Sequence, residues 1–127
     1  MLNSADWRTL AEYCHTLPIG FMSSPFDLEA VDLLVEAGVD ALKIASGEIT
    51  HRQLLERVAE TGLPVFLSTG ASTLFEVARA LEWLVPTKPT LLACTLSYPT
   101  DDGNAELGRI TTLRRSYPDH RVGYSDH

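Results

Sequence analysis

The feature of this sequence that most constrains its fold is a regular alternation of apolar, strand-like runs with segments of helical periodicity. Five runs have the length and residue types of buried strands, and they lie at residues 17–22, 40–45, 63–68, 90–95 and 121–124. Between them apolar residues recur at helical spacing, and no run is joined to the next by a hairpin turn. This order predicts right-handed βαβ units, with a parallel sheet covered by helices.

Capping residues predict where the helices begin and end. In chain order, the expected start signals are Ser4, Asp27, the Thr50–Gln53 capping box, the Thr73–Glu76 capping box and Asn104. Gly38 and Gly62 follow the second and third helices, and glycine favours the left-handed conformation in which many helices end.

The size and charge of the chain limit its domain organisation and its partners. With 127 residues, of which 45% are hydrophobic, we expect a single domain over residues 1–127. Its 10 Lys and Arg against 17 Asp and Glu give a formal net charge of −7, which disfavours nucleic acid and anionic membrane surfaces as partners. No apolar run approaches the ~20 residues that span a bilayer, and no signal-like segment opens the chain, so we expect a cytoplasmic protein.

Polar residues at the ends of the predicted strands distinguish a barrel from an open sheet. In a (β/α)₈ barrel every strand delivers functional groups to one face, at its carboxyl end. Here all five runs are followed by such groups: Ser23, Ser24 and Asp27; Lys43, Ser46 and Glu48; Ser68, Thr69 and Ser72; Thr95, Ser97 and Tyr98; and Ser125, Asp126 and His127. An open sheet usually has a glycine-rich turn after its first strand, which "MSSPFD" is not. Because five strands do not close a ring of eight, we predict an α/β fold that is an incomplete (β/α)₈ TIM barrel.

Five motifs at these strand ends, "SSPFD", "KIASGEI", "LSTGAST", "CTLSYPT" and "VGYSDH", resemble in order and spacing the N-acetylneuraminate (sialic acid) synthase family. The resemblance covers residues 20–127 and implies a transferase that condenses phosphoenolpyruvate with N-acetylmannosamine or a related amino sugar, giving a nonulosonic acid and phosphate. It implies that the chain holds the third to seventh strands of the family barrel, without the first two strands, the eighth strand or the C-terminal antifreeze-like domain. The site is then expected to be incomplete, and full-length members are expected to be homodimers.

Three residues of "KIASGEI" form the predicted centre of the site. Lys43 interrupts an apolar run, and a buried ammonium is costly unless it is paired or faces a ligand. By the resemblance, Lys43 and Ser46 bind phosphoenolpyruvate, and Lys43 and Glu48 are the catalytic residues, with Glu48 as the candidate acid or base. The alternatives are a salt-bridged structural lysine, a serine that caps a turn and a glutamate that caps the next helix.

Further site residues are implied by the resemblance alone. It places Ser24 and Ser125 in the phosphate site and Tyr98 against the sugar. The alternative for Ser24 is a turn residue, and the alternative for Tyr98 is a core tyrosine. Leu96 departs from the family, in which many members have Asn or Ser at this position to bind phosphoenolpyruvate. Leucine cannot donate a hydrogen bond, and Ser97 is the candidate to compensate for it.

His127 is the expected metal ligand. A histidine at the exit of a barrel strand, with oxygen and water ligands, suits Mn²⁺ or Mg²⁺. One histidine alone is weak evidence, since the chain has four, but the resemblance implies that the histidine of "SDH" binds the metal. We therefore expect a divalent metal, Mn²⁺ or Mg²⁺, as cofactor.

Two other functions remain open on the residues alone. Lys43 is able to form a Schiff base with a ketone, as in metal-independent aldolases built on similar barrels. We also expect little activity from this chain alone, which leaves an inactive sugar-phosphate-binding or assembly fragment as the non-enzymatic alternative.

Overall fold

Five parallel strands form the sheet of this protein and lie side by side in sequence order. The computed structural model describes residues 3–127. The strands are β1 (Met22–Ser23), β2 (Ala41–Ile44), β3 (Val65–Ser68), β4 (Thr90–Ala93) and β5 (Val122–Tyr124). The helices are α1 (Ser4–His15), α2 (Leu28–Ala37), α3 (Arg52–Glu60), α4 (Leu74–Trp83) and α5 (Gly108–Ser116), with 3₁₀ turns η1 (Ser46–Glu48) and η2 (Asp102–Asn104). Across these residues, no helix is both long and apolar enough to cross a membrane.

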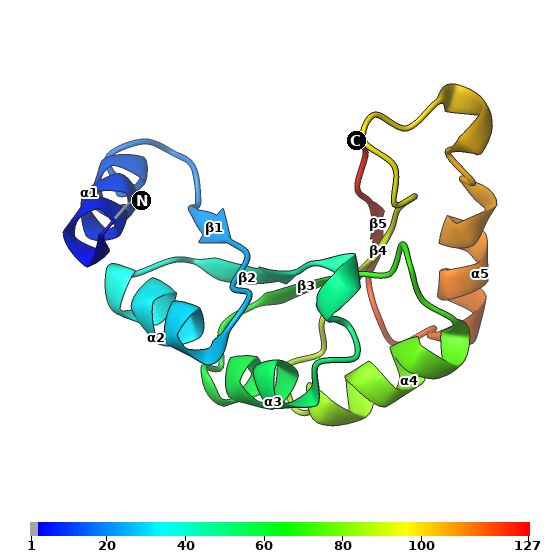
Figure 1. The fold of residues 1–127 in the computed structure, drawn as a ribbon, viewed down its shortest axis with the longest axis horizontal. Helices are drawn as coiled ribbons and strands as arrows, with labels where there is room; N and C mark the ends of the chain where they lie inside the picture. The colour runs from blue at the N-terminus through cyan, green and yellow to red at the C-terminus, as the bar shows by residue number, and fades with distance from the viewer. Residues whose placement is uncertain (1–2) are drawn as a thin grey trace.

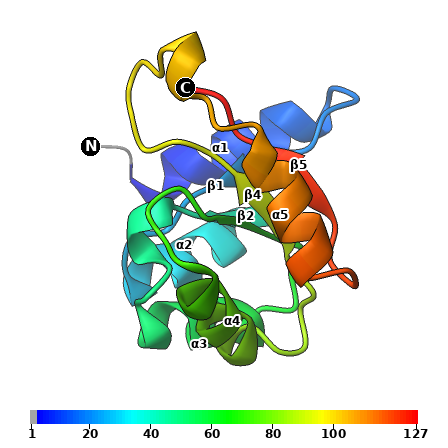
Figure 2. The same ribbon diagram turned by 90° about the vertical axis from the view of Figure 1, so that its right-hand side faces the viewer.

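The sheet and its helices form an arc of a barrel. Helices α2, α3, α4 and α5 follow one another along one side of the sheet, as Figure 1 and the turned view in Figure 2 show. A doubly wound sheet reverses its strand order and carries helices on both faces, whereas this sheet keeps the order β1-β2-β3-β4-β5 with every neighbouring pair parallel. Sequential parallel strands with helices outside are the arrangement of a TIM barrel. The predicted α/β fold, five parallel units of such a barrel, is confirmed.

The pleat of β2 sends alternate side chains to opposite faces of the sheet. Leu42 and Ile44 are fully buried in the core shared with the helices, whereas Lys43 between them is half-buried. Lys43 is the register partner of Phe66 in β3, so both residues belong to the opposite, inner face. The lysine that interrupts the apolar run of the sequence therefore avoids the core between sheet and helices.

The core lies between the sheet and the helices. Its fully buried members include Leu42, Ile44, Leu67 and Leu91 from the strands and Leu54, Leu55, Val58 and Val77 from the helices. Complete burial of one leucine side chain stabilises a fold by about 1.5–3 kcal/mol. Helix α3 contributes three of these side chains because positions 54, 55 and 58 fall on one helical face.

Two predicted helix starts are confirmed in detail. Asp27 caps α2, and its side chain accepts the N–H of Ala30 at 2.7 Å. The Thr73 hydroxyl accepts the N–H of Glu76 at 3.2 Å, and the Glu76 carboxylate accepts the N–H of Thr73 at 2.7 Å, so the capping box of α4 is complete. Gly38 ends α2 with a φ of 84°, as the sequence predicts.

Two other predicted starts are displaced by one or two residues. Asn3, not Ser4, caps α1, and Ser4 is the first helical residue. The predicted Thr50–Gln53 capping box is wrong, because α3 begins at Arg52 and its cap, His51, makes no side-chain capping bond. Thr50 lies in the turn that follows η1, so the helix boundary falls later than the motif suggests.

The predicted start of the fifth helix is also wrong. Asn104 ends η2, and α5 begins only at Gly108. Leu107, directly before this helix, is 58% exposed.

The first strand is much shorter than the predicted run of residues 17–22. Leu17 and Ile19 are exposed, and only Met22–Ser23 forms a strand. The N–H of Phe21 donates to the side chain of Asp40 at 2.7 Å instead of to a neighbouring strand. Residues 16–18 form a turn after α1, and the run approaches β2 only at its end, where the Phe21 carbonyl accepts the N–H of Asp40 at 2.8 Å.

Candidate active site

Three strand ends meet at the buried hydroxyl of Ser46. Ser46 follows β2 and is 7% exposed. Its Oγ accepts a hydrogen bond from the N–H of Gly70, which follows β3, at 3.0 Å. The Sγ of Cys94, which follows β4, lies 3.4 Å from the same oxygen. We call Ser46, Gly70 and Cys94 the Ser46 cluster.

Gly70 makes this convergence possible because it has no side chain. A Cβ at residue 70 would lie 3.0 Å from both Ser46 Oγ and Cys94 Sγ, and 3.1 Å from the Cys94 carbonyl oxygen. Contacts this short require the surroundings to move, so glycine alone allows the backbone to approach the hydroxyl. The sequence indicates a flexible residue in "LSTGAST" but not the two side chains that it contacts.

Ser68 supplies a buried hydroxyl beside this cluster. It is the last residue of β3, is 2% exposed and pairs in register with Leu92, which places it on the same inner face as Phe66. Within residues 3–127 its Oγ has no hydrogen-bond partner. A buried hydroxyl without a partner costs about 1–3 kcal/mol, so Ser68 Oγ is available to a ligand or a water molecule. The sequence places Ser68 at a strand end but does not reveal that it is unbonded.

A second group of side chains gathers where β4 and β5 end. His127 Nδ1 lies 3.1 Å from the carbonyl oxygen of Thr95, and His127 Nε2 lies 3.4 Å from Ser125 Oγ. The rings of His127 and Tyr98 are adjacent, with centroids 4.1 Å apart. A carbonyl accepts only, so Nδ1 carries the proton and Nε2 keeps its lone pair in the neutral ring. We call Thr95, Tyr98, Ser125 and His127 the His127 cluster.

The two clusters share one stretch of backbone. Cys94 belongs to the Ser46 cluster and the next residue, Thr95, to the His127 cluster. The N–H of Ser125 donates to the carbonyl of Ala93 at 2.9 Å, which fixes the end of β5 beside that stretch. The structure thus brings four of the predicted site residues, Ser46, Tyr98, Ser125 and His127, to one edge of the sheet.

The described residues do not complete a metal site. Within residues 3–127, no three His, Cys, Asp or Glu side chains gather closely enough to hold a metal ion. His127 Nε2 has the chemistry of a ligand, but one imidazole and a hydroxyl fall short of a full set. His127 therefore stays a predicted ligand.

Lys43 and Glu48 do not bond to each other. Among residues 3–127, Lys43 on the inner face has no hydrogen-bond or ion-pair partner. The Glu48 carboxylate instead lies 3.1 Å from His51 Nδ1, three residues along the chain. Sequence reasoning missed His51, although its spacing from Glu48 is that of neighbours on one helical face.

Ser24 follows β1, whose last residue Ser23 pairs with Leu42 of β2. It is half-buried and lines a cavity of about 630 Å³ together with Trp7 and Asp27, beside α1 and α2. No hydrogen bond described for residues 3–127 links it to Ser46 or Lys43. Its role in phosphate binding stays a prediction.

Tyr124 supports the edge of the sheet as a neutral phenol. Burial raises its pKa above the ordinary value of 10.0, and electrostatic repulsion from Asp126 acts in the same direction. The hydroxyl therefore keeps its proton near neutrality and donates it to the carbonyl of Ala105 at 3.4 Å. This contact holds the segment after η2 beside the His127 cluster.

Comparisons with known proteins agree with this architecture. Residues 1–127 match the sequence model of the NeuB family. The chain is 41% identical over 114 residues to the N,N'-diacetyllegionaminic acid synthase of Campylobacter jejuni, with 86% of this chain and 34% of that protein covered. Its fold is similar to that of an N-acetylneuraminic acid (sialic acid) synthetase from Leptospira borgpetersenii, with a TM-score of 0.92, 37% identity, and 99% of this chain and 45% of that chain covered.

A more distant comparison concerns the fold alone. A truncated 3-deoxy-D-arabino-heptulosonate 7-phosphate synthase from Thermotoga maritima has a TM-score of 0.81 at 15% identity, with 98% of this chain and 49% of that chain covered. The chain spans 34% to 38% of the length of the first curated relatives that it matches.

Proposed function

This chain belongs to the NeuB family, and from that premise we propose that it forms part of the active site of a synthase that condenses phosphoenolpyruvate with an N-acetylated amino sugar. In this reaction carbon 3 of phosphoenolpyruvate attacks the aldehyde carbon of the open-chain sugar, water adds at carbon 2, and phosphate leaves. The products are a nonulosonic acid and inorganic phosphate. Legionaminic, pseudaminic and sialic acid synthases all occur among the relatives, and N-acetylmannosamine is the sugar we would test first.

The Ser46 cluster carries this proposal. Because Ser46 Oγ already accepts the N–H of Gly70, its own proton is free to be donated to a phosphate oxygen. The neighbouring Cys94 sulfur is a weak acceptor and competes poorly with a phosphate. A buried hydroxyl held in this way is already oriented for its ligand.

Two further donors on the inner face support anion binding. Lys43 in β2 has no ion-pair partner within residues 3–127, and the buried Ser68 Oγ in β3 has no hydrogen-bond partner there. A compact ammonium suits the point charge of a phosphate or carboxylate. We assign Lys43, Ser46 and Ser68 to phosphoenolpyruvate, with Ser125 and Ser24 as predicted additional contacts. These local donors attract an anion although the chain carries a net charge of −7.

Glu48 is the proposed acid or base. Its carboxylate is 26% exposed and lies 3.1 Å from His51 Nδ1, which orients it and receives or returns a proton. The proton of the water that adds at carbon 2, or that of the sugar hydroxyl, is the candidate for transfer.

The His127 cluster is the proposed place of the sugar and of the metal. Tyr98 is 70% exposed and presents an aromatic surface against which a sugar ring packs. His127 is proposed as one ligand of Mn²⁺ or Mg²⁺, a metal that polarises the sugar carbonyl when it is bound. Within residues 3–127, no group of three His, Cys, Asp or Glu side chains completes this ligand set.

Binding of phosphoenolpyruvate to this chain tests the proposal. We expect saturable shifts of the Gly70 and Ser46 amide signals in a ¹H–¹⁵N NMR titration. Ser46→Ala should weaken binding by about ten-fold or more, since a hydrogen bond to a charged group contributes about 1.5–3 kcal/mol. Ser116→Ala, at the exposed end of α5, is the matched control and should bind normally. No saturable binding, or equal affinity in Ser46→Ala, would overturn the proposal.

Phosphate release is the second measurement. With phosphoenolpyruvate, N-acetylmannosamine and Mn²⁺ we expect little or no release by this chain, because the described residues do not complete a metal site. Rapid turnover would show instead that these residues suffice for the reaction.

A further inference from the structure

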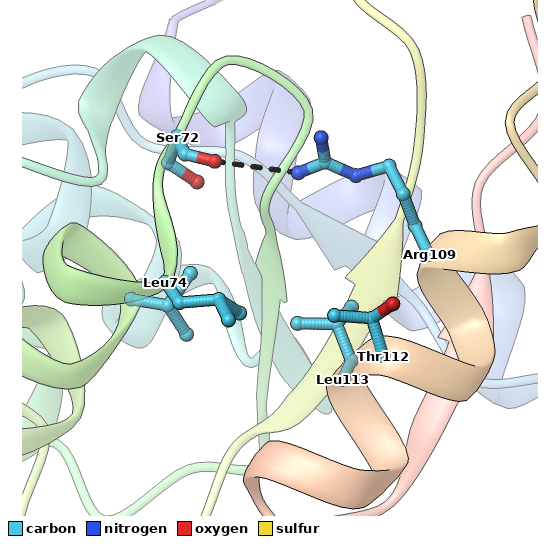
Figure 3. Close-up of a pocket in the computed structure, with 6 residues that line it drawn as sticks. Ser72, Leu74, Arg109, Thr112 and Leu113 are labelled. Atoms are coloured by element: carbon cyan, nitrogen blue, oxygen red, sulfur yellow. Dashed lines mark hydrogen bonds between the residues drawn. The ribbon is translucent and has the colours of Figure 1, made fainter.

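Arg109 reaches from α5 to the loop that carries Gly70. It is the second residue of α5, and its Nη2 donates to the carbonyl of Thr69 at 2.6 Å and to that of Ser72 at 3.3 Å. Figure 3 shows the side chain extending across from α5 to Ser72 on the neighbouring loop. The two carbonyls bracket Gly70, so one guanidinium group holds both ends of the segment that approaches Ser46.

The rest of this loop is fixed by its own bonds. The Thr69 N–H and hydroxyl both donate to the carbonyl of Leu92, each at 3.0 Å, which ties residue 69 to β4. The Ser72 hydroxyl donates back to the Thr69 carbonyl at 3.0 Å. Between these anchors the Gly70 N–H meets Ser46 Oγ at 3.0 Å. The position of this N–H is therefore set by the shape of residues 69–72.

Few other polar contacts hold Arg109 in this position. Its nearest carboxylate, Glu106, lies 3.8 Å from Nη1 and is mostly exposed, so it provides a weak ion pair. Its Nε is buried without a hydrogen-bond partner among residues 3–127. The side chain thus leaves one donor unbonded while Nη2 is used on two neutral carbonyls of a single loop.

We infer that Arg109 is a positioning residue for phosphoenolpyruvate binding, which acts through Thr69, Gly70 and Ser72 to hold the hydroxyl of Ser46 in place. This inference rests on the proposed function, since the bond between Gly70 and Ser46 matters for binding only if Ser46 contacts phosphoenolpyruvate. Arginine suits the task because the two N–H groups of Nη2 point in fixed directions in the guanidinium plane, so this one nitrogen reaches both carbonyls. Loss of the guanidinium should loosen the loop and weaken the anion site with little effect on the core.

The test compares Arg109→Met and Arg109→Lys with wild type by amide hydrogen exchange. The reporter is the Gly70 N–H, and the reference is the Leu42 N–H, which bonds to the Pro64 carbonyl at 3.0 Å in the centre of the sheet. Arg109→Met should speed exchange at Gly70 by about ten-fold with little change at Leu42, because the loop opens locally and not by global unfolding. Arg109→Lys should restore part of the protection. Arg114→Met, exposed on the same helix, is the control and should leave both rates unchanged.

Affinity for phosphoenolpyruvate is measured on the same variants. We expect Arg109→Met to weaken binding by about five-fold or more, because Ser46 loses its orientation while no ligand contact is removed. Arg109→Lys should be intermediate. The urea midpoint should stay unchanged in both variants. Equal acceleration at Gly70 and Leu42 would show a general stabilising role and overturn the inference, as would unchanged exchange at Gly70. If Arg109→Met does not fold, the Arg109→Lys variant decides on the same two rates.

The failure of the proposed function would look different. If wild type does not bind phosphoenolpyruvate, the phosphate site is refuted for this chain, and the positioning of Ser46 for that ligand falls with it. If wild type binds and the Arg109 variants bind and exchange as wild type does, the phosphate site stands and the role of Arg109 is refuted.

Discussion

The ring of Tyr98 lies against the imidazole of His127, with centroids 4.1 Å apart and planes tilted by 31°. The same imidazole has Nδ1 on the Thr95 carbonyl, so Nε2 is the nitrogen left for a ligand. Mn²⁺ added to the chain should therefore broaden the NMR signals of His127 and Ser125 before others, with weak affinity because one imidazole is a poor site. His127→Ala should abolish this selective broadening, whereas His120→Ala should not. Uniform broadening over the acidic surface would contradict the prediction.

Gly70→Ala should damage both stability and phosphoenolpyruvate binding. The new Cβ would lie 3.0 Å from Ser46 Oγ and Cys94 Sγ, and overpacking of this kind costs about 1–3 kcal/mol. Gly103→Ala is the matched control, since a Cβ there meets no atom within 4 Å. Urea denaturation measures the loss, and equal stability of the two variants would argue against the close approach at Gly70.

Ser68→Ala should weaken phosphoenolpyruvate binding without lowering the stability of the fold. The buried Oγ has no hydrogen-bond partner within residues 3–127, so its removal should leave the free energy of unfolding unchanged or raise it. Affinity for phosphoenolpyruvate should fall by about ten-fold if this hydroxyl serves the anion. A stability loss with unchanged affinity would indicate a structural bond to Ser68 instead.

Lys43 should not form a covalent adduct with a ketone substrate. In the proposed condensation the lysine binds an anion through charge, and no imine is formed. Incubation with pyruvate and borohydride, followed by intact mass spectrometry, should leave the mass unchanged. The chain has one other lysine, Lys88, so Lys43→Arg and Lys88→Arg variants would locate any adduct. An adduct lost only in Lys43→Arg would favour a Schiff-base aldolase.

Acid should weaken the contact between α1 and the start of β2. The pKa of Asp40 lies below its ordinary value of 3.8, chiefly because its carboxylate accepts the N–H of Phe21 and also because it bonds to His15. A lowered folded-state pKa adds stability above pH 3.8, and this contribution is lost as the pH falls through the folded-state value. The difference in urea midpoint between wild type and Asp40→Asn should therefore be present at neutral pH and shrink in acid. Asp119→Asn, exposed before β5, should show no comparable trend.

Local signals in the sequence predicted local structure well. The Thr73–Glu76 box and the Asp27 cap are confirmed because each bond joins residues three apart, whose geometry depends on little else. The Thr50–Gln53 box fails because η1 occupies the preceding residues and delays the helix. The first strand fails for a different reason, since a strand needs a partner distant in sequence that periodicity does not reveal.

The sequence predicts where the candidate site lies, but it does not predict which of its residues contact one another. Parallel strands end at one edge, so the sequence correctly brings Ser46, Ser125 and His127 to that edge. Which groups touch depends on the shape of the connecting loops. The bond from Gly70 to Ser46 and the pairing of Glu48 with His51 therefore appear only in three dimensions.

Cys94 and Thr95 are consecutive, yet each belongs to a different cluster. The sulfur beside Ser46 and the carbonyl beneath His127 are therefore carried by adjacent residues of one chain segment. If a ligand at one cluster moves this segment, thermodynamic reciprocity requires the two ligands to change each other's affinity by the same factor.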